Sequence, residues 1–283
     1  MSRALIIIPT YKERDNVEEL AGQLLAIAGP ELRDAASSSA AKPGDAASAP
    51  APGAATAYGA TAATAYGAAP AYGAAAAAAA SVIELLFVDD NSPDGTGQVL
   101  DALAAAEPRL HVLHRAGKLG LGTAYVEGFR WGLARDYDVL IQMDADGSHD
   151  PKYLPQLFAA LSAGADVAVG SRYVPGGGTQ NWGLARRLLS RGGSLYARTV
   201  LGLAVRDMTA GFLCWRRAAL EAIDLDSLTS NGYSFQIETK LRALRAGLRL
   251  VETPILFVDR KVGQSKMSKA IVLEAVTKVW RLR

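Results

Sequence analysis

Two carboxylates stand one residue apart in the segment Met143-Asp144-Ala145-Asp146-Gly147-Ser148-His149, directly after an apolar run. Because alternate residues of an extended chain point the same way, Asp144 and Asp146 can reach one point beyond the end of that run. Two carboxylates with few other good ligands suit Mg²⁺ or Mn²⁺, hard cations that also bind phosphate oxygens of a substrate. We therefore predict a divalent-cation site at Asp144 and Asp146, with Ser148 as a further ligand. The other interpretation is an acidic turn that caps a helix beginning near Pro151.

A second acidic cluster is Asp89-Asp90-Asn91-Ser92-Pro93-Asp94-Gly95. A carboxylate after a strand can accept hydrogen bonds from ribose hydroxyls or from the edge of a base, as acidic residues do in dinucleotide-binding folds. The same residues are also good turn formers. We expect both to hold, with the turn presenting Asp90 to a nucleoside.

The glycine-rich segment Lys118-Leu119-Gly120-Leu121-Gly122 precedes a predicted helix. It either holds a phosphate at the helix N-terminus or forms a close-packed turn. No G-x-G-x-x-G or G-x-x-x-x-G-K-[ST] motif follows the first predicted strand. Nicotinamide-dependent oxidoreductases and P-loop hydrolases are therefore poor interpretations.

Hydrophobic patterns predict the elements that must position these clusters. Strands are expected at 4–8, 82–88, 110–114, 138–143 and 166–170, and helices at 15–28, 96–106, 121–136 and from near Pro151. Strands that alternate with helices indicate an α/β fold with a Rossmann-like, doubly wound, mainly parallel sheet. The polar clusters 9–13, 89–94, 144–150 and 171–173 all follow strands. Ligands bind at the carboxyl ends of such strands, so the clusters predict one common site.

Composition divides the 283 residues into unequal parts. Alanine makes up 25 of the 50 residues in 31–80, which predicts a low-complexity insertion with no role in the core. The catalytic domain is then expected to comprise 1–30 and 81–267. One cysteine, Cys214, excludes a disulfide framework and a cysteine-rich zinc site.

Charge is also uneven along the chain. The net charge is +2, but residues 240–283 carry +8 and the remainder −6. This distribution predicts an anionic partner at one place, not a nucleic acid that coats the protein. We find no signal peptide and no long apolar run that would cross a membrane. Basic amphipathic patterns at 182–203 and 268–283 predict either helices that lie on a lipid surface or ordinary core-packing helices.

Several ordered motifs together resemble the family 2 glycosyltransferases, and within them the polyprenyl (dolichyl) phosphate mannosyltransferases. The resemblance covers nearly the whole chain except 31–80. It is carried by segments 9–16, 88–96, 118–125, 143–149, 170–173 and 257–260, and is strengthened by 231–238 and 263–267.

This resemblance implies a glycosyltransferase-A type fold and the inverting transfer of mannose from GDP-mannose to a polyprenyl phosphate. It implies a peripheral location at the cytoplasmic face of a membrane, or a membrane-anchoring partner. The implied nucleotide-sugar contacts are Pro9, Tyr11, Glu13, Val88, Asp90, Asp144, Ala145, Asp146, Arg172, Arg260 and Lys266. The implied contacts to the acceptor phosphate are Arg172, Arg186 and Ser190, and Asp146, Arg172 and Arg260 carry the catalytic roles.

Three rival functions stay open at the sequence level. The same fold can transfer glucose or another sugar from a UDP-sugar. A non-catalytic protein that binds nucleotide sugars would need no intact charged cluster. A peripheral membrane adaptor would need only the two basic amphipathic segments.

Overall fold

The computed structural model describes residues 3–27, 82–259 and 276–283. The predicted insertion at 31–80, the candidate site residues Arg260 and Lys266, and 268–275 of the predicted C-terminal helix lie outside the described residues. The predicted helical character of the C-terminal segment can be followed only in residues 276–281, which are helical.

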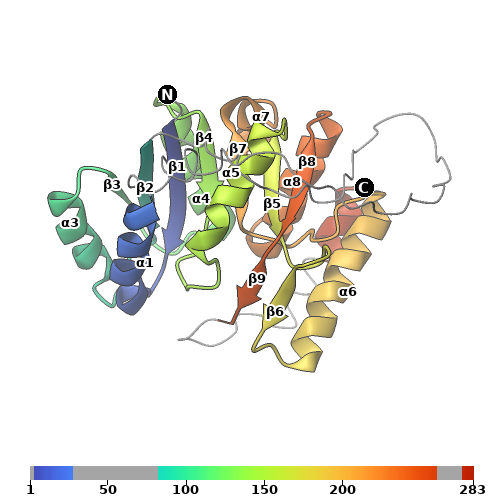
Figure 1. The fold of residues 1–283 in the computed structure, drawn as a ribbon, viewed down its shortest axis with the longest axis horizontal. Coiled ribbons are helices and arrows are strands. Elements are labelled where there is room, and N and C mark those ends of the chain that lie inside the picture. Colours follow the sequence, from blue (N-terminus) through green and yellow to red (C-terminus); the bar gives the residue numbers. More distant parts are fainter. Residues whose placement is uncertain (1–2, 28–81, 260–275) are drawn as a thin grey trace, which may run out of the picture.

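A seven-stranded sheet with the order β3-β2-β1-β4-β7-β5-β8 forms the centre of the molecule (Figure 1). Its strands are β1 (Arg3–Thr10), β2 (Val82–Asp89), β3 (Leu110–His114), β4 (Val139–Gln142), β5 (Val167–Ser171), β7 (Leu213–Arg216) and β8 (Leu250–Pro254). All five predicted strands are present, and the expected α/β, mainly parallel sheet is confirmed. The exception is β7, which pairs antiparallel with both β4 and β5. The hydrophobic patterns did not predict this strand.

Helices cover both faces of the sheet because the strands are apolar on both sides. Ala4, Ile6 and Ile8 of β1 pack into one core with α1 (Arg14–Ile27), α3 (Thr96–Ala106) and α5 (Leu154–Ser162). Leu5 and Ile7 of the same strand pack into a second core with α4 (Leu121–Leu133) and α8 (Gly232–Arg245). The helix expected from near Pro151 begins as a 3₁₀ turn, η2 (Pro151–Tyr153). Short elements α7 (Arg217–Glu221) and η3 (Leu225–Ser227) follow β7.

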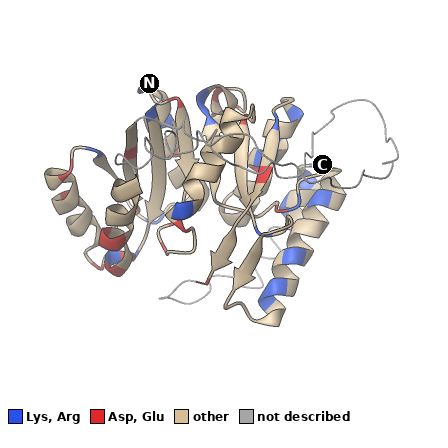
Figure 2. Cartoon of the chain, in the orientation of Figure 1, with Lys and Arg blue, Asp and Glu red and all other residues tan. Residues whose placement is uncertain are grey.

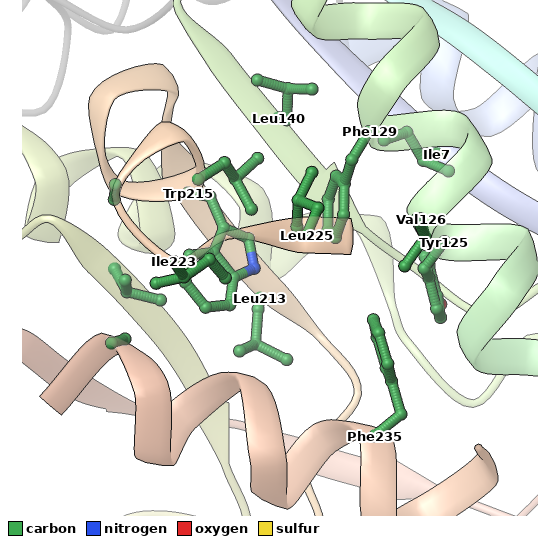
Figure 3. Packing of buried hydrophobic residues seen from close by; sticks show 14 of the residues in the cluster. Ile7, Tyr125, Val126, Phe129, Leu140, Leu213, Trp215, Ile223, Leu225 and Phe235 are labelled. Carbon is green, nitrogen blue, oxygen red and sulfur yellow. The ribbon is translucent and has the colours of Figure 1, made fainter. Parts of the chain in front are cut away.

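The second core is rich in aromatic side chains, and they join the sheet to α4 and α8 (Figure 3). The rings of Tyr125 and Phe235 stack with centroids 5.9 Å apart, and Phe129 meets Trp215 edge-on at 6.5 Å. Aromatic pairs in these geometries add about 0.5–1.5 kcal/mol beyond the area they bury. The stack therefore fixes α8 against α4 beneath the carboxyl ends of the strands.

A smaller unit lies beyond the sheet, where β6 (Gly178–Gln180) pairs with β9 (Leu256–Val258) and α6 (Leu184–Leu201) follows β6. Arginines recur along α6, where Figure 2 colours the ribbon blue. The same helix exposes Leu184 and Leu188, with 73% and 63% of their surface accessible. Helix α6 therefore matches the predicted amphipathic segment at 182–203. No helix among the described residues has the length and apolarity to cross a membrane.

Candidate active site

A cavity of about 630 Å³ opens where the strands end. Strand register explains why it gathers residues that are distant in sequence. Pro9 of β1 pairs with Val88 of β2, and Ile7 pairs with Gln142 of β4, so 9–13, 90 and 144–146 emerge side by side. Ten predicted site residues line the cavity: Pro9, Tyr11, Glu13, Asp90, Asp144, Ala145, Asp146, Arg172, Arg186 and Ser190.

Asp144 is held in place by hydrogen bonds to Tyr125 and His149. Its Oδ1 accepts a hydrogen bond from the Tyr125 hydroxyl at 3.0 Å, and its backbone N–H donates to Nδ1 of His149 at 3.0 Å. Burial, with the charge of Asp144 adding to it, raises the pKa of Tyr125, so the phenol keeps its proton. Burial lowers the pKa of His149, which favours a neutral ring that can accept the Asp144 N–H. The site therefore fixes both the backbone and the carboxylate of Asp144.

Asp146 is fixed by a tight local turn. Its Oδ1 accepts the Ser148 hydroxyl at 2.5 Å and the Ser148 backbone N–H at 3.1 Å. Ser148 is buried and is not among the residues that line the cavity. The structure thus gives Ser148 a contact that orients Asp146, while its expected role as a cation ligand stays a prediction.

Asp90 lines the cavity in front of a buried arginine. Nη1 of Arg115 lies 2.6 Å from Asp90 Oδ1, while the other carboxylate oxygen accepts the backbone N–H of Leu119 at 3.2 Å. Burial raises the pKa of Asp90 above its ordinary value, although the charge of Arg115 opposes that shift. Arg115 also donates to the carbonyl of Gly120 and to the hydroxyl of Thr123. One arginine therefore couples Asp90 to the glycine-rich loop.

The glycine-rich loop closes one side of the cavity. Gly120 has φ +106°, and a Cβ there would lie 2.8 Å from Oδ1 of Asn231, so only glycine fits. Nζ of Lys118 lies 4.4 Å from the centroid of the Tyr11 ring. Tyr11 thus presents an aromatic face beside a cation, a surface suited to the base and the phosphates of a nucleotide.

Arg172 brings a positive charge to the cavity and is held by several hydrogen bonds. Its Nε and Nη2 donate to the two oxygens of Asp207 at 2.7 and 2.6 Å, and Nη2 also donates to Thr209 at 2.7 Å. Burial opposes ionisation of Asp207, but the charge and hydrogen bonds of Arg172 outweigh it and hold the pKa of Asp207 below its ordinary value. Asp207 is fully buried and does not line the cavity, whereas Arg172 does.

Arg186 and Ser190 of α6 extend this basic wall. Nη1 of Arg186 lies 2.6 Å from Oδ1 of Asp259, and its guanidinium lies 4.1 Å from the ring centroid of Trp182. The Ser190 hydroxyl accepts the Tyr173 hydroxyl at 2.7 Å. The three residues expected to contact an acceptor phosphate, Arg172, Arg186 and Ser190, therefore share one cavity.

Among the described residues, Val88 is the other predicted contact that does not line the cavity. Its side chain is fully buried in the second core with Leu5 and Ile7. Sequence reasoning missed Arg115 and Asp207, the buried partners of Asp90 and Arg172. It also missed Gln236, which lines the cavity from α8. A charged residue directly after a strand was the available signal for Arg115, and Gln236 lay inside a motif already singled out.

The carboxylates fit a divalent cation that is shared with a substrate. Within the described part of the chain, no three His, Cys, Asp or Glu side chains come together as a metal cluster. Asp144 and Asp146 both line the cavity, and Mg²⁺ is commonly held by one or two carboxylates plus substrate phosphates and water. The donor set therefore suits a hard cation that arrives with a diphosphate.

Sequence comparison gives two close relatives. The chain is 54% identical over 198 residues to "Undecaprenyl-phosphate mannosyltransferase" of Micrococcus luteus, an alignment covering 70% of this chain and 81% of that protein. It is 51% identical over 208 residues to "Polyprenol monophosphomannose synthase" of Mycolicibacterium smegmatis, covering 72% of this chain and 78% of that protein.

Structure comparison supports the fold. The crystal structure of glucosyl-3-phosphoglycerate synthase from Mycobacterium tuberculosis with phosphoglyceric acid matches 99% of this chain and 80% of its own, with a TM-score of 0.58 at 15% identity. The same enzyme in complex with Mn²⁺, UDP-glucose and glycerol 3-phosphate matches with a TM-score of 0.57. These likenesses confirm the expected glycosyltransferase-A type fold.

The family itself is identified by sequence. The profile described as "Glycosyl transferase family 2" matches residues 71–224, more than half of the chain. Together with relatives above 50% identity, this match confirms the resemblance inferred from the motifs. The chain belongs to glycosyl transferase family 2 and is a glycosyltransferase.

Proposed function

We propose that this enzyme transfers mannose from GDP-mannose to a polyprenyl phosphate, with inversion at the anomeric carbon. The observation that carries the proposal is one cavity that holds two carboxylates, Asp144 and Asp146, together with two arginines, Arg172 and Arg186. A donor diphosphate and an acceptor phosphate are both anions, and a site for both needs cations around them. The names of the two close relatives support the acceptor class and the sugar.

The acceptor needs no base from the protein. A phosphate monoester oxygen is already anionic at neutral pH, so it can attack the anomeric carbon as the bond to the leaving GDP oxygen breaks. Attack from the face opposite the leaving group inverts the configuration. The protein then contributes position and charge stabilisation. We assign the attacking phosphate to Arg172, Arg186 and Ser190, which all line the cavity.

The leaving diphosphate is assigned to Asp144 and Asp146. A bound Mg²⁺ or Mn²⁺ would neutralise charge on the diphosphate oxygens as it departs. Asp146 is oriented by Ser148, and Asp144 by Tyr125 and His149, so both carboxylates are fixed before substrate arrives. Asp146 and Arg172 are the described residues on which we expect catalysis to depend most.

The nucleoside is assigned to the wall built from β1, β2 and the glycine-rich loop. Tyr11 offers a face for the base, and Glu13 and Asp90 offer acceptors for base or ribose donors. Pro9, near the end of β1, and Ala145, between the two aspartates, line the same cavity. Arg260 and Lys266, which the resemblance assigns to the diphosphate, stay predictions outside the described residues.

A polyprenyl acceptor keeps its tail in a bilayer, so the enzyme must work at a membrane surface. We propose that α6 provides that contact. Leu184, Leu188 and Leu195 are 60–73% exposed on it, next to arginines that suit anionic headgroups. Arg186 and Ser190, on the same helix, line the cavity. This arrangement would place the phosphate site at the depth of the headgroups.

A donor assay tests the proposed reaction. Purified enzyme is incubated with undecaprenyl phosphate, Mg²⁺ or Mn²⁺, and either GDP-[¹⁴C]mannose or UDP-[¹⁴C]glucose. We expect label in the lipid phase from the guanosine donor and a product of inverted anomeric configuration by NMR. Label only from the uridine donor would replace GDP-mannose with the rival donor, and no transfer from either would favour the non-catalytic or adaptor hypothesis.

The cation assignment is tested with Asp146→Asn. Loss of one carboxylate from the diphosphate site should lower kcat/KM by at least about 100-fold, since such a cation supplies several kcal/mol of charge stabilisation. Asp136→Asn, an exposed position remote from the cavity, is the matched control. Activity of Asp146→Asn equal to that of the control would remove the assignment.

The membrane contact is tested by flotation with phosphatidylglycerol vesicles. Leu184→Glu combined with Leu188→Glu should reduce vesicle binding and leave the melting temperature unchanged, because both side chains are exposed. Ala102→Glu combined with Ala105→Glu, both exposed on α3, adds the same charge away from α6. Equal binding of the two variants would exclude α6 as the docking surface.

A further inference from the structure

A chain of buried hydrogen bonds runs from the second core to the cavity. Nε1 of Trp215 donates to Oε1 of Gln142 at 2.8 Å, and Nε2 of Gln142 donates to Oε1 of Gln236 at 3.4 Å. An indole nitrogen can only donate, so it requires the oxygen of Gln142 and turns the Gln142 nitrogen toward Gln236. The direction of every bond in the chain is thereby set. Gln236 must present its oxygen to Gln142 and its N–H₂ group elsewhere.

That N–H₂ group has no partner among the described residues. Nε2 of Gln236 is buried, the whole side chain is 2% exposed, and the residue lines the cavity. A buried donor without a partner costs about 1–3 kcal/mol. The oxygen of the Gln236 amide is fixed by Gln142, and its nitrogen has no partner in the described part of the chain. We therefore infer that this nitrogen is a hydrogen-bond donor for a ligand.

Gly211 defines where that ligand group would sit. A Cβ built on Gly211 would lie 3.6 Å from Nε2 of Gln236, 3.7 Å from Oδ2 of Asp144 and 3.5 Å from Cε1 of His149. A donor and an acceptor thus border one point that the absence of a side chain leaves open. A phosphate oxygen at this point would touch the Asp144 carboxylate with no room for a cation between them, and the two would repel each other. A hydroxyl can accept from Gln236 and donate to Asp144, so it satisfies both.

We propose that Gln236 binds a ring hydroxyl of the transferred sugar and is a specificity-determining residue of the donor site. The proposal rests on the proposed glycosyl transfer, and it adds a sugar contact to a cavity whose other assigned residues hold base, phosphates or cation. Trp215 and Gln142 act as positioning residues, because they fix which end of the Gln236 amide faces the sugar.

Binding measurements without acceptor test this contact. Calorimetry would compare the Kd of GDP-mannose with that of GDP, in the presence of Mg²⁺, for the wild type and Gln236→Met. Methionine keeps the length of the side chain and removes the donor. We expect about tenfold weaker binding of GDP-mannose and unchanged binding of GDP. Gln156→Met is the matched control, since Gln156 donates to a backbone carbonyl outside the cavity.

A set of GDP-mannose analogues, each lacking one ring hydroxyl, identifies the group. The analogue that lacks the contacted hydroxyl should bind the wild type more weakly than GDP-mannose does, and it should bind Gln236→Met and the wild type equally well. Each of the other analogues should still bind Gln236→Met more weakly than it binds the wild type. Equal losses for GDP and GDP-mannose, or equal losses across all analogues, would mean a structural role and overturn the proposal. Unchanged affinity of Gln236→Met for GDP-mannose would overturn it as well.

Two arms separate this outcome from failure of the proposed function. If the wild type prefers a uridine donor, the same comparison is made between UDP-glucose and UDP, so the Gln236 contact is judged whatever the base. If Gln236→Met does not fold, Gln236→Asn retracts the amide by one methylene and should show the same selective loss. Because no acceptor is present, an incorrect acceptor assignment leaves the result intact.

Discussion

Two buried ion pairs border the cavity, and they present opposite charges to it. In the pair Arg115–Asp90 the carboxylate lines the cavity and the arginine stands behind it. In the pair Arg172–Asp207 the arginine lines the cavity and the carboxylate stands behind it. Each arginine also donates through Nη2 to a threonine hydroxyl, Thr123 or Thr209. The same local construction thus yields an acceptor at the proposed nucleoside end and a cation at the proposed phosphate end.

The two pairs differ in what happens when the supporting member is lost. A carboxylate left alone can take up a proton, and burial already raises the pKa of Asp90. An arginine left alone stays charged, because its guanidinium does not lose its proton in proteins. The cation end of the site therefore depends more strongly on its partner than the acceptor end does.

The largest effect is expected from Asp207→Asn. It leaves the buried Arg172 charge uncompensated, which should cost roughly 4 kcal/mol of folding stability. Urea unfolding of the variant and the wild type measures the loss. The double variant Arg172→Met with Asp207→Leu should recover most of the stability and none of the transfer activity. A single variant as stable as the wild type would contradict the asymmetry.

Arg115→Met should cost less, roughly 2 kcal/mol at pH 7, because Asp90 can become neutral. The sign of the pH dependence follows from the raised pKa of Asp90 in the folded protein. The folded state of the variant then holds a proton that the unfolded state releases, so stability is present at low pH and declines as pH rises through the folded pKa. Unfolding between pH 5 and pH 8, compared with Asp207→Asn, checks this. A penalty independent of pH would show that Asp90 stays ionised.

The threonine contacts sharpen the same comparison at smaller scale. Thr209→Val removes a hydrogen bond to Arg172 at a half-buried position and should cost about 1–2 kcal/mol. Thr123→Val removes a bond at an exposed position and should cost about 0.5 kcal/mol. Thermal unfolding of both variants measures the difference. If Thr123→Val lost more stability than Thr209→Val, the acceptor end would depend on its support more than the cation end, contrary to our expectation.

A last effect, confined to acidic pH, concerns His149, which lies beside Asp144. Burial lowers its pKa below the ordinary 6.5, so unfolding takes up a proton when the pH falls below that value. Stability is therefore lost as pH falls from 6.5, by at most about 1.4 kcal/mol per pH unit. His149→Gln should flatten this part of the melting-temperature profile relative to the wild type. An unchanged slope would mean that other groups carry it.

Much of this architecture was predictable because it depends on local patterns. The strand ends at 9–13, 89–94, 144–150 and 171–173 were assigned from apolar runs followed by polar residues, and parallel register then brings them together. The supporting partners were not predictable in this way. Asp207 lies 35 residues beyond Arg172, and only the tertiary fold brings them into contact. Strand β7 was missed for the same reason, since its antiparallel pairing with β4 and β5 depends on long-range contacts.

Strand β7 also has a consequence for the order of folding. The strands β4 and β5 do not pair with each other; each pairs with β7, whose residues 213–216 follow both of them in sequence. During synthesis the sheet β3-β2-β1-β4 can form first, but β5 has no neighbour that joins it to that sheet until β7 leaves the ribosome. Asp144 follows β4 and Arg172 follows β5. The carboxylates and the arginine are therefore assembled into one cavity only after the last third of the chain begins to emerge.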